Sequence, residues 1–193
     1  RELLNFSWGI ADVEDCVNGA QYAANTGLVD PKRLIIRGSS AGGFTALAAL
    51  AFHDVFSAGA VSYGIGDLEA LTKETHKFEA RYNDILVAPY PEGNAEYVKR
   101  SPLYHADKIK APVVFFQGLD DKVVLPAQAE AMVAALKQTG TPVALVTYEN
   151  EGHGFRNPDT IVDSLQKELS FYGEIFGFEP HDDIESIQIE NKR

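Results

Sequence analysis

The stretch Arg37-Gly38-Ser39-Ser40-Ala41-Gly42-Gly43 decides the fold that this sequence predicts. A run rich in β-branched residues, 33–37, leads into it and predicts a buried strand, and a strongly apolar run, 44–52, follows it and predicts a helix. A serine held in a sharp strand-to-helix turn needs neighbours without bulky side chains two positions away on each side, and the sequence places Gly38 and Gly42 there. The motif therefore predicts that Ser40 stands exposed at the end of a strand, directly before a helix.

Predicted strands and helices alternate along the rest of the chain. Apolar runs predict further strands at 57–63, 112–117 and 143–148, and helical spacing predicts further helices at 12–26, 126–138 and 159–176. This alternation indicates an α/β fold, with a mostly parallel sheet that carries helices on both faces. Between 64 and 107 the pattern is weaker, and we expect two short helices, at about 68–76 and 94–100, in an insertion over one end of the sheet.

The composition excludes several classes of protein. Hydrophobic residues make up 45% of the 193, which is enough to fill a core and excludes a mainly disordered chain. The formal net charge is -11 and the basic residues are scattered, so we expect no nucleic-acid partner. No apolar run approaches the roughly 20 residues that a membrane-spanning helix needs, so we expect no membrane partner either.

Cysteine usage bears on the compartment and on metal binding. Cys16 is the single cysteine, so an internal disulfide is excluded and a reducing, cytoplasmic location is expected. The sequence begins at Arg1 without an initiator methionine, which leaves a signal peptide open. No spacing of histidines or carboxylates predicts a metal site, and 38–43 lacks both the lysine of a phosphate loop and the GxGxxG pattern. We therefore expect no metal and no cofactor.

A serine hydroxyl needs a base, and the partners of Ser40 are expected on loops after later strands, in the order Ser, acid, His. The acidic pair Asp120-Asp121 follows the strand predicted at 112–117, and His153 follows the strand predicted at 143–148. These loops meet at the end of the sheet where open α/β proteins bind ligands. Either acid can orient His153 on physical grounds. The backbone N–H of Ala41, at the start of a helix, is expected to stabilise a developing oxyanion.

Several motifs in the right order resemble the catalytic domain of the prolyl oligopeptidase family, most closely its acylaminoacyl-peptidase and dipeptidyl-aminopeptidase branch. The motifs are 37–43, 116–124 and Gly152-His153-Gly154-Phe155, together with Trp8-Gly9, Asp12 and 76–82. The resemblance implies an α/β-hydrolase fold over residues 1–178 and leaves 179–193 as an acidic C-terminal tail. It implies Ser40 as the nucleophile, His153 as the base and, from the acidic pair, Asp120 as the carboxylate that orients the base.

The resemblance also implies a reaction. We expect a serine-type peptidase that hydrolyses short peptides through an acyl-enzyme on Ser40. Lys122 takes the place of a basic residue that contacts a substrate carbonyl in related peptidases, and is a candidate for that role. The aromatic stretch 78–90 either forms a wall of the substrate pocket or packs over the core. Association into a homo-oligomer stays open.

Members of this family also carry an N-terminal β-propeller and earlier hydrolase strands, one of which supplies a second oxyanion donor. We therefore expect this sequence to be the C-terminal portion of a catalytic domain, with N-terminal strands missing and a propeller in the full-length parent. Two other functions stay open. One is a carboxylesterase or thioesterase, because the triad does not specify the leaving group. The other is a catalytically silent fragment, because one missing oxyanion donor costs about 10²- to 10³-fold in rate.

Overall fold

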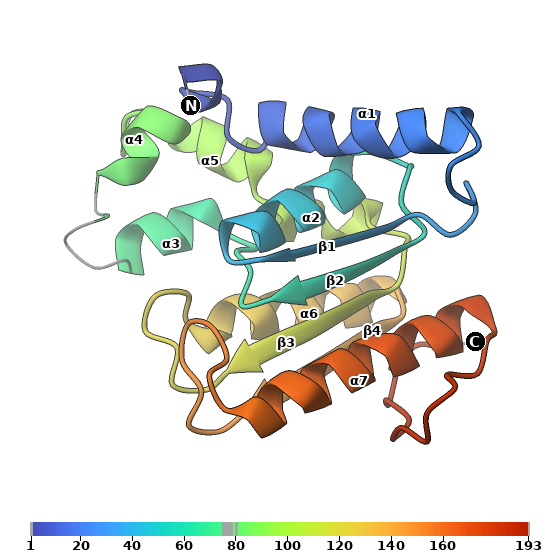
Figure 1. The fold of residues 1–193 in the computed structure, drawn as a ribbon. Coiled ribbons are helices and arrows are strands. Elements are labelled where there is room, and N and C mark those ends of the chain that lie inside the picture. The colour runs from blue at the N-terminus through green and yellow to red at the C-terminus, as the bar shows by residue number, and fades with distance from the viewer. Residues whose placement is uncertain (1, 75–78, 80, 193) are drawn as a thin grey trace.

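The computed structural model describes residues 2–74, 79 and 81–192. Within these residues a four-stranded, fully parallel sheet forms in the order β1-β2-β3-β4 (Figure 1). The strands are β1 (Ile35–Ser39), β2 (Ala58–Ser62), β3 (Val113–Gly118) and β4 (Val143–Tyr148). All four predicted strands are confirmed. The first lies two residues nearer Ser40 than predicted, because Gly38 and Ser39 continue the ladder opposite Val61 and Ser62.

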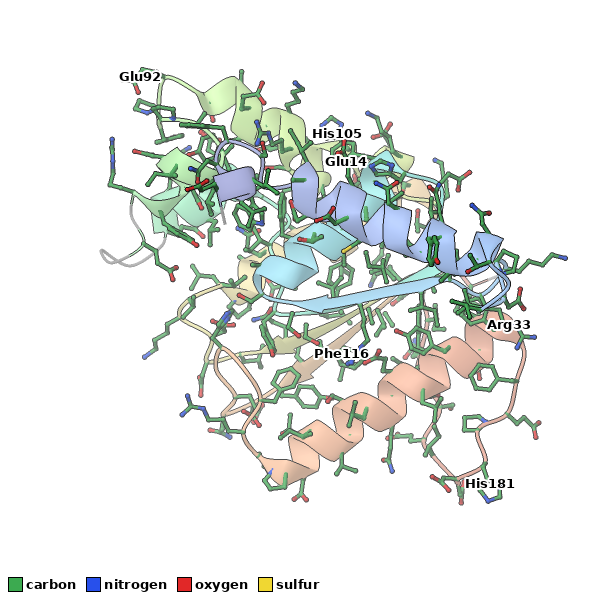
Figure 2. All side chains as sticks on the ribbon, turned by 45° about the horizontal axis from the view of Figure 1, so that its top comes forward. Glu14, Arg33, Glu92, His105, Phe116 and His181 are labelled. Carbon is green, nitrogen blue, oxygen red and sulfur yellow. The ribbon has the colours of Figure 1, made fainter. Side chains whose placement is uncertain are left out.

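Helices cover both faces of the sheet, as the alternating pattern predicted. On one face lie α2 (Ala41–Phe52) and α6 (Pro126–Thr139), with α1 (Ala11–Asn25) packed outside α2, and on the other lies α7 (Pro158–Phe176) (Figure 1). The larger apolar core lies between the sheet and α2 and α6, and contains the fully buried Phe44 and Phe115. A second core lies under α7, where Phe116 of β3 points toward that helix (Figure 2).

The other short elements are η1 (Glu2–Leu4), α3 (Leu68–Glu74), α4 (Tyr82–Leu86), α5 (Asn94–Arg100) and η2 (Pro102–Lys108). Figure 1 shows α3 and α4 beyond the end to which the arrows point, whereas η2 packs against α2 and α6. The helix at 94–100 has its predicted bounds. The helix predicted at 68–76 is present to Glu74, and its last two positions lie outside the described residues. The sequence pattern did not predict α4 or η2. The five residues of α4 are too few to show a period, and η2 is a 3₁₀ helix interrupted at His105, so it lacks the α-helical period.

The tail from residue 179 returns to the sheet. Glu190 pairs with Val143 of β4, with its amide donating over 2.9 Å and its carbonyl accepting over 3.1 Å. Ile187 and Ile189 pack against the core under α7. The tail therefore covers part of the outer edge of β4. In the described ranges, we find no helix with the length and apolar character that crossing a bilayer requires.

Candidate active site

Ser40 lies at the turn between β1 and α2, in a backbone conformation with φ 54° and ψ -121°. Few residues other than glycine adopt a positive φ, and such a strained residue costs about 1–3 kcal/mol that the surrounding structure must supply. The Ser40 amide donates to the Ser62 carbonyl over 3.0 Å, which holds the turn against β2.

The two glycines that flank the turn differ in their contacts. A Cβ on Gly38 would lie 2.0 Å from the carbonyl oxygen of Gly42, so only glycine allows this approach. A Cβ on Gly42 itself would meet nothing within 4 Å. The predicted steric reason for the motif is therefore confirmed for Gly38 and wrong for Gly42.

His153 lies on the loop after β4, and a buried carboxylate organises that loop. The two Glu151 oxygens accept the Arg156 and Asn157 amides, each over 2.9 Å, and the Glu151 carbonyl accepts the Asp120 amide over 2.9 Å. Burial favours the neutral carboxyl, but these backbone hydrogen bonds outweigh burial and lower the pKa of Glu151. The loop that carries His153 is thus tied both to itself and to the acidic loop after β3.

Ser40, His153 and Asp121 form a continuous hydrogen-bonded chain. His153 Nδ1 lies 2.8 Å from Asp121 Oδ2, and His153 Nε2 lies 2.8 Å from Ser40 Oγ. An ionised carboxylate only accepts, so Nδ1 carries the ring proton and donates to Asp121. Nε2 is then free to accept the Ser40 hydroxyl proton. The arrangement is that of a nucleophile, a base and a group that orients the base.

The prediction of Asp120 as the orienting carboxylate is wrong, because the geometry brings Asp121 to His153. Asp120 is exposed, whereas the Asp121 side chain is fully buried. Asp121 Oδ1 accepts the Val123 and Val124 amides over 2.9 and 3.0 Å, and this turn aims Oδ2 at the imidazole. Burial opposes ionisation of Asp121, but the hydrogen bonds from His153 and the two amides outweigh it and hold the pKa of the carboxyl below its usual value.

Two neighbouring groups complete the surroundings of the triad. Ala41 is the first residue of α2 and borders the cleft beside Ser40, which puts the positive end of a helix dipole next to the Ser40 side chain. The Tyr63 ring makes an edge contact with the His153 ring, with centroids 4.9 Å apart, and a second one with Phe155. Sequence reasoning missed Tyr63, although its place directly after β2, at the same end of the sheet, was a usable signal.

A cleft of about 430 Å³ opens beside the triad and is mostly apolar. Its lining residues are Leu4, Trp8, Ser40, Ala41, Ile65, Leu71, Glu79, Tyr82, Asn83, Leu86, Val123, Val124 and His153. Part of the predicted 78–90 wall is present here, while Phe78 lies outside the described residues. Lys122, the candidate for a substrate contact, is exposed and is not among the described residues that line the cleft. The same described residues hold no group of three or more His, Cys, Asp or Glu side chains arranged for a metal ion.

Comparisons with known proteins give the family and the fold. A puromycin-hydrolyzing peptidase of Mycobacterium tuberculosis is similar over 98% of this chain, with 46% identity and a TM-score of 0.96. Dipeptidyl aminopeptidase BIII of Pseudoxanthomonas mexicana is 30% identical over 80% of the chain, and an acylamino-acid-releasing enzyme of Arabidopsis thaliana is 31% identical over 81%. The chain spans 29%, 23% and 22% of these three proteins, respectively.

The predicted α/β-hydrolase fold is confirmed by this structural likeness. The sequence pattern of the Prolyl oligopeptidase family matches residues 1–179, which is nearly the whole chain. Two of the three relatives are named as peptidases. On the family pattern, the chain belongs to the prolyl oligopeptidase family.

Proposed function

We propose that this chain carries the catalytic groups of a serine-type peptidase that hydrolyses short peptides through an acyl-enzyme on Ser40. One observation carries the proposal: the two 2.8 Å hydrogen bonds that join Ser40 to His153 and His153 to Asp121. Membership of a peptidase family supports it. Asp121 replaces Asp120 in the predicted triad.

In the acylation step, His153 Nε2 takes the proton of Ser40 Oγ as Oγ forms a bond to the substrate carbonyl carbon. The imidazolium that forms is stabilised by the Asp121 carboxylate at Nδ1. Negative charge develops on the carbonyl oxygen, and the Ala41 N–H at the start of α2 donates to it. His153 then gives its Nε2 proton to the leaving amine as the carbon–nitrogen bond breaks, which leaves the acyl group on Ser40.

Hydrolysis of the acyl-enzyme repeats these steps with water. His153 Nε2 takes a proton from water as its oxygen attacks the ester carbon, and then returns the proton to Ser40 Oγ as the ester bond breaks. The free acid leaves, and the enzyme returns to its starting state. The Tyr63 ring, with its centroid 4.9 Å from that of the imidazole, adds a packing contact to the two hydrogen bonds that position His153.

The lining of the cleft bears on the kind of substrate. Apolar side chains dominate the lining next to Ser40, and burial of an apolar acyl-side group there is worth about 1.5–3 kcal/mol for a side chain the size of leucine or phenylalanine. We therefore propose short peptides whose residue before the scissile bond has an apolar side chain.

The first test is the intact mass of the full-length protein after incubation with a fluorophosphonate probe. One adduct on the wild type and none on Ser40→Ala are expected, because only an activated serine reacts with the probe at an appreciable rate. Folding of the Ser40→Ala variant is checked by circular dichroism. A wild-type protein that is folded but unlabelled would contradict the proposal.

A second measurement separates a peptidase from an esterase. An aminoacyl p-nitroanilide and the matching p-nitrophenyl ester are compared on full-length enzyme that has not been treated with the probe. A peptidase cleaves both, whereas cleavage of the ester alone would assign the same triad to an esterase.

A further inference from the structure

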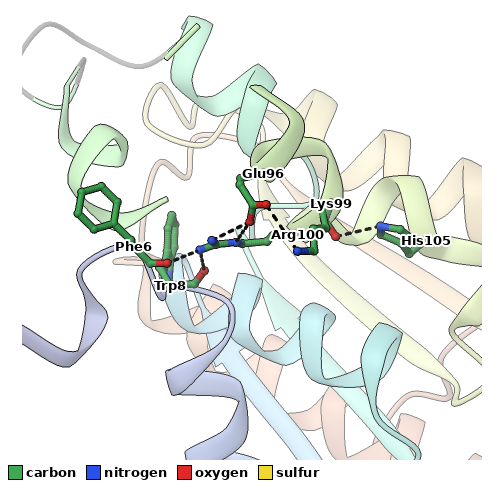
Figure 3. Close-up of polar contacts among 6 residues, drawn as sticks. All are labelled: Phe6, Trp8, Glu96, Lys99, Arg100 and His105. Atoms are coloured by element: carbon green, nitrogen blue, oxygen red, sulfur yellow. Dashed lines mark hydrogen bonds and ion pairs between the residues drawn. The ribbon is translucent and has the colours of Figure 1, made fainter. Parts of the chain in front are cut away.

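Arg100 is a buried cation that touches the wall of the cleft from behind. It lies at the end of α5 and is 8% exposed. Its Nε and one terminal nitrogen donate to a single Glu96 oxygen over 3.2 and 2.9 Å. The other terminal nitrogen donates to the Phe6 and Trp8 carbonyls over 3.0 and 3.2 Å (Figure 3). The guanidinium therefore joins α5 to the backbone of residues 6–8.

The segment 6–9 belongs to neither a helix nor the sheet, so contacts with other segments hold it in place. On its amide side, Phe6 donates to the Ile85 carbonyl over 2.7 Å and Trp8 donates to the Leu86 carbonyl over 3.1 Å. Phe6 has φ 55° and Gly9 has φ 81°, so the chain turns at both ends of the segment. The amides thus face the 85–86 wall of the cleft, and the two carbonyls face Arg100.

Trp8 connects this backbone to the substrate cleft. Its side chain lines the cleft together with Ser40, and its ring packs on Phe44 with centroids 4.6 Å apart. A shift of the Trp8 carbonyl toward α5 would move the indole relative to Leu86, which lies across the segment and lines the same cleft. The Arg100 contacts therefore lie on the backbone of a residue that lines the apolar part of the cleft.

We propose that Arg100 is a positioning residue that fixes the Trp8 wall of the cleft and so sets the affinity for substrates with a bulky apolar acyl-side group. The inference rests on the proposed function, and it adds a residue that touches neither the substrate nor the reacting atoms. Glu96 acts with it, because two charge-assisted hydrogen bonds from Arg100 to one carboxylate oxygen restrict the rotation of the guanidinium.

Lys99 offers a matched control on the same helix. Its ammonium lies 3.5 Å from the other Glu96 oxygen, and its side chain is 72% exposed (Figure 3). Lys99→Met removes one positive charge beside Glu96, as Arg100→Met does, but leaves the carbonyl contacts of residues 6–8 in place. Arg100→Lys keeps the charge and loses the planar fork that reaches two carbonyls at once.

The test compares KM and kcat of the full-length protein for a phenylalanyl and a glycyl p-nitroanilide. Arg100→Met is expected to raise KM for the phenylalanyl substrate by about tenfold or more, because small displacements of positioning groups carry large kinetic costs. The expected change in kcat is less than about threefold. A higher KM with little change in kcat is expected when the lost contact stabilised the bound substrate and the transition state equally. Arg100→Lys should be intermediate, and Lys99→Met should match the wild type. The glycyl substrate should change little in every variant.

Trp8 supplies a spectroscopic readout in the same samples. The fluorescence of Trp8 is taken as the difference between each protein and its Trp8→Phe counterpart, and the emission should shift to the red in Arg100→Met as the indole gains water contact. An equal rise in KM for both substrates would overturn the role of Arg100. So would an unchanged KM together with an unchanged emission wavelength. If Arg100→Met does not fold, Arg100→Lys is tested in its place, with the KM for the phenylalanyl substrate and the Trp8 emission as the two measurements that decide. Fluorophosphonate labelling separates the two proposals, because an unlabelled wild type contradicts the triad, whereas labelled variants with unaltered selectivity contradict only Arg100.

Discussion

Replacement of each acid in the pair Asp120-Asp121 by asparagine tests which carboxylate serves His153. In Asp121→Asn, the amide oxygen can keep the Val123 and Val124 contacts, while the amide nitrogen then faces His153 Nδ1. The NH₂ group donates, so Nδ1 must accept and the ring proton moves to Nε2. The base then presents a proton to Ser40 instead of a lone pair.

The size of the effect follows from the charge that is lost. Two unit charges about 4 Å apart interact by about 4 kcal/mol at an effective dielectric constant of about 20. The 2.8 Å between Nδ1 and Oδ2 and the full burial of Asp121 place the pair at least in this range. Loss of that stabilisation from the imidazolium corresponds to about 10³-fold in rate, and the wrong tautomer extends the expected loss to about 10⁴-fold.

The assay is kcat/KM on a peptide p-nitroanilide together with the second-order rate of fluorophosphonate labelling. Asp120→Asn is the matched control, because it makes the same chemical change one residue away on an exposed side chain, and it should stay within about threefold of the wild type, as surface substitutions usually do. A loss on Asp120→Asn equal to or greater than that on Asp121→Asn would refute the assignment of Asp121.

Two further predictions concern the loops that hold the triad. Gly38→Ala should lower the free energy of unfolding by about 1–3 kcal/mol and abolish fluorophosphonate labelling, because its Cβ would overlap the Gly42 carbonyl. Gly42→Ala is the control and should have the same urea midpoint of unfolding as the wild type. Glu151 and Asp121 have folded-state pKa values below their usual ones, so their ionised forms stabilise the fold above about pH 4–5, and this stability is lost as the pH falls through the folded values. Glu151→Gln should therefore lower the melting temperature at pH 7, and the difference in melting temperature from the wild type should become smaller below pH 4. A difference that stays constant with pH would contradict this role of Glu151.

The sequence pattern was sufficient to locate the strands and two members of the proposed triad for a physical reason. Long apolar runs have a clear period, and a parallel sheet collects the loops after its strands at one end. The glycine spacing selects Ser40 over Ser39, and His153 is the one histidine on its loop, so the topology is enough to bring the two residues together.

The choice between Asp120 and Asp121 could not be made in this way. Both follow β3, and which one reaches His153 depends on a turn in which one side chain accepts the amides two and three residues ahead. Residue spacing does not encode that rotation. The contact of Tyr63 with His153 and the contacts of Arg100 with 6–8 join segments far apart in the sequence, and such contacts appear only when the chain is folded.

The return of the tail to β4 has a consequence for how the protein can be divided. The family pattern ends at residue 179, and a boundary drawn there would remove Ile187, Ile189 and Glu190. The Val143 amide and carbonyl would lose their partners, and apolar surface under α7 would meet water. An unpaired strand edge next to exposed apolar surface favours pairing with another chain, so we expect a chain cut at residue 179 to self-associate more readily than the longer one.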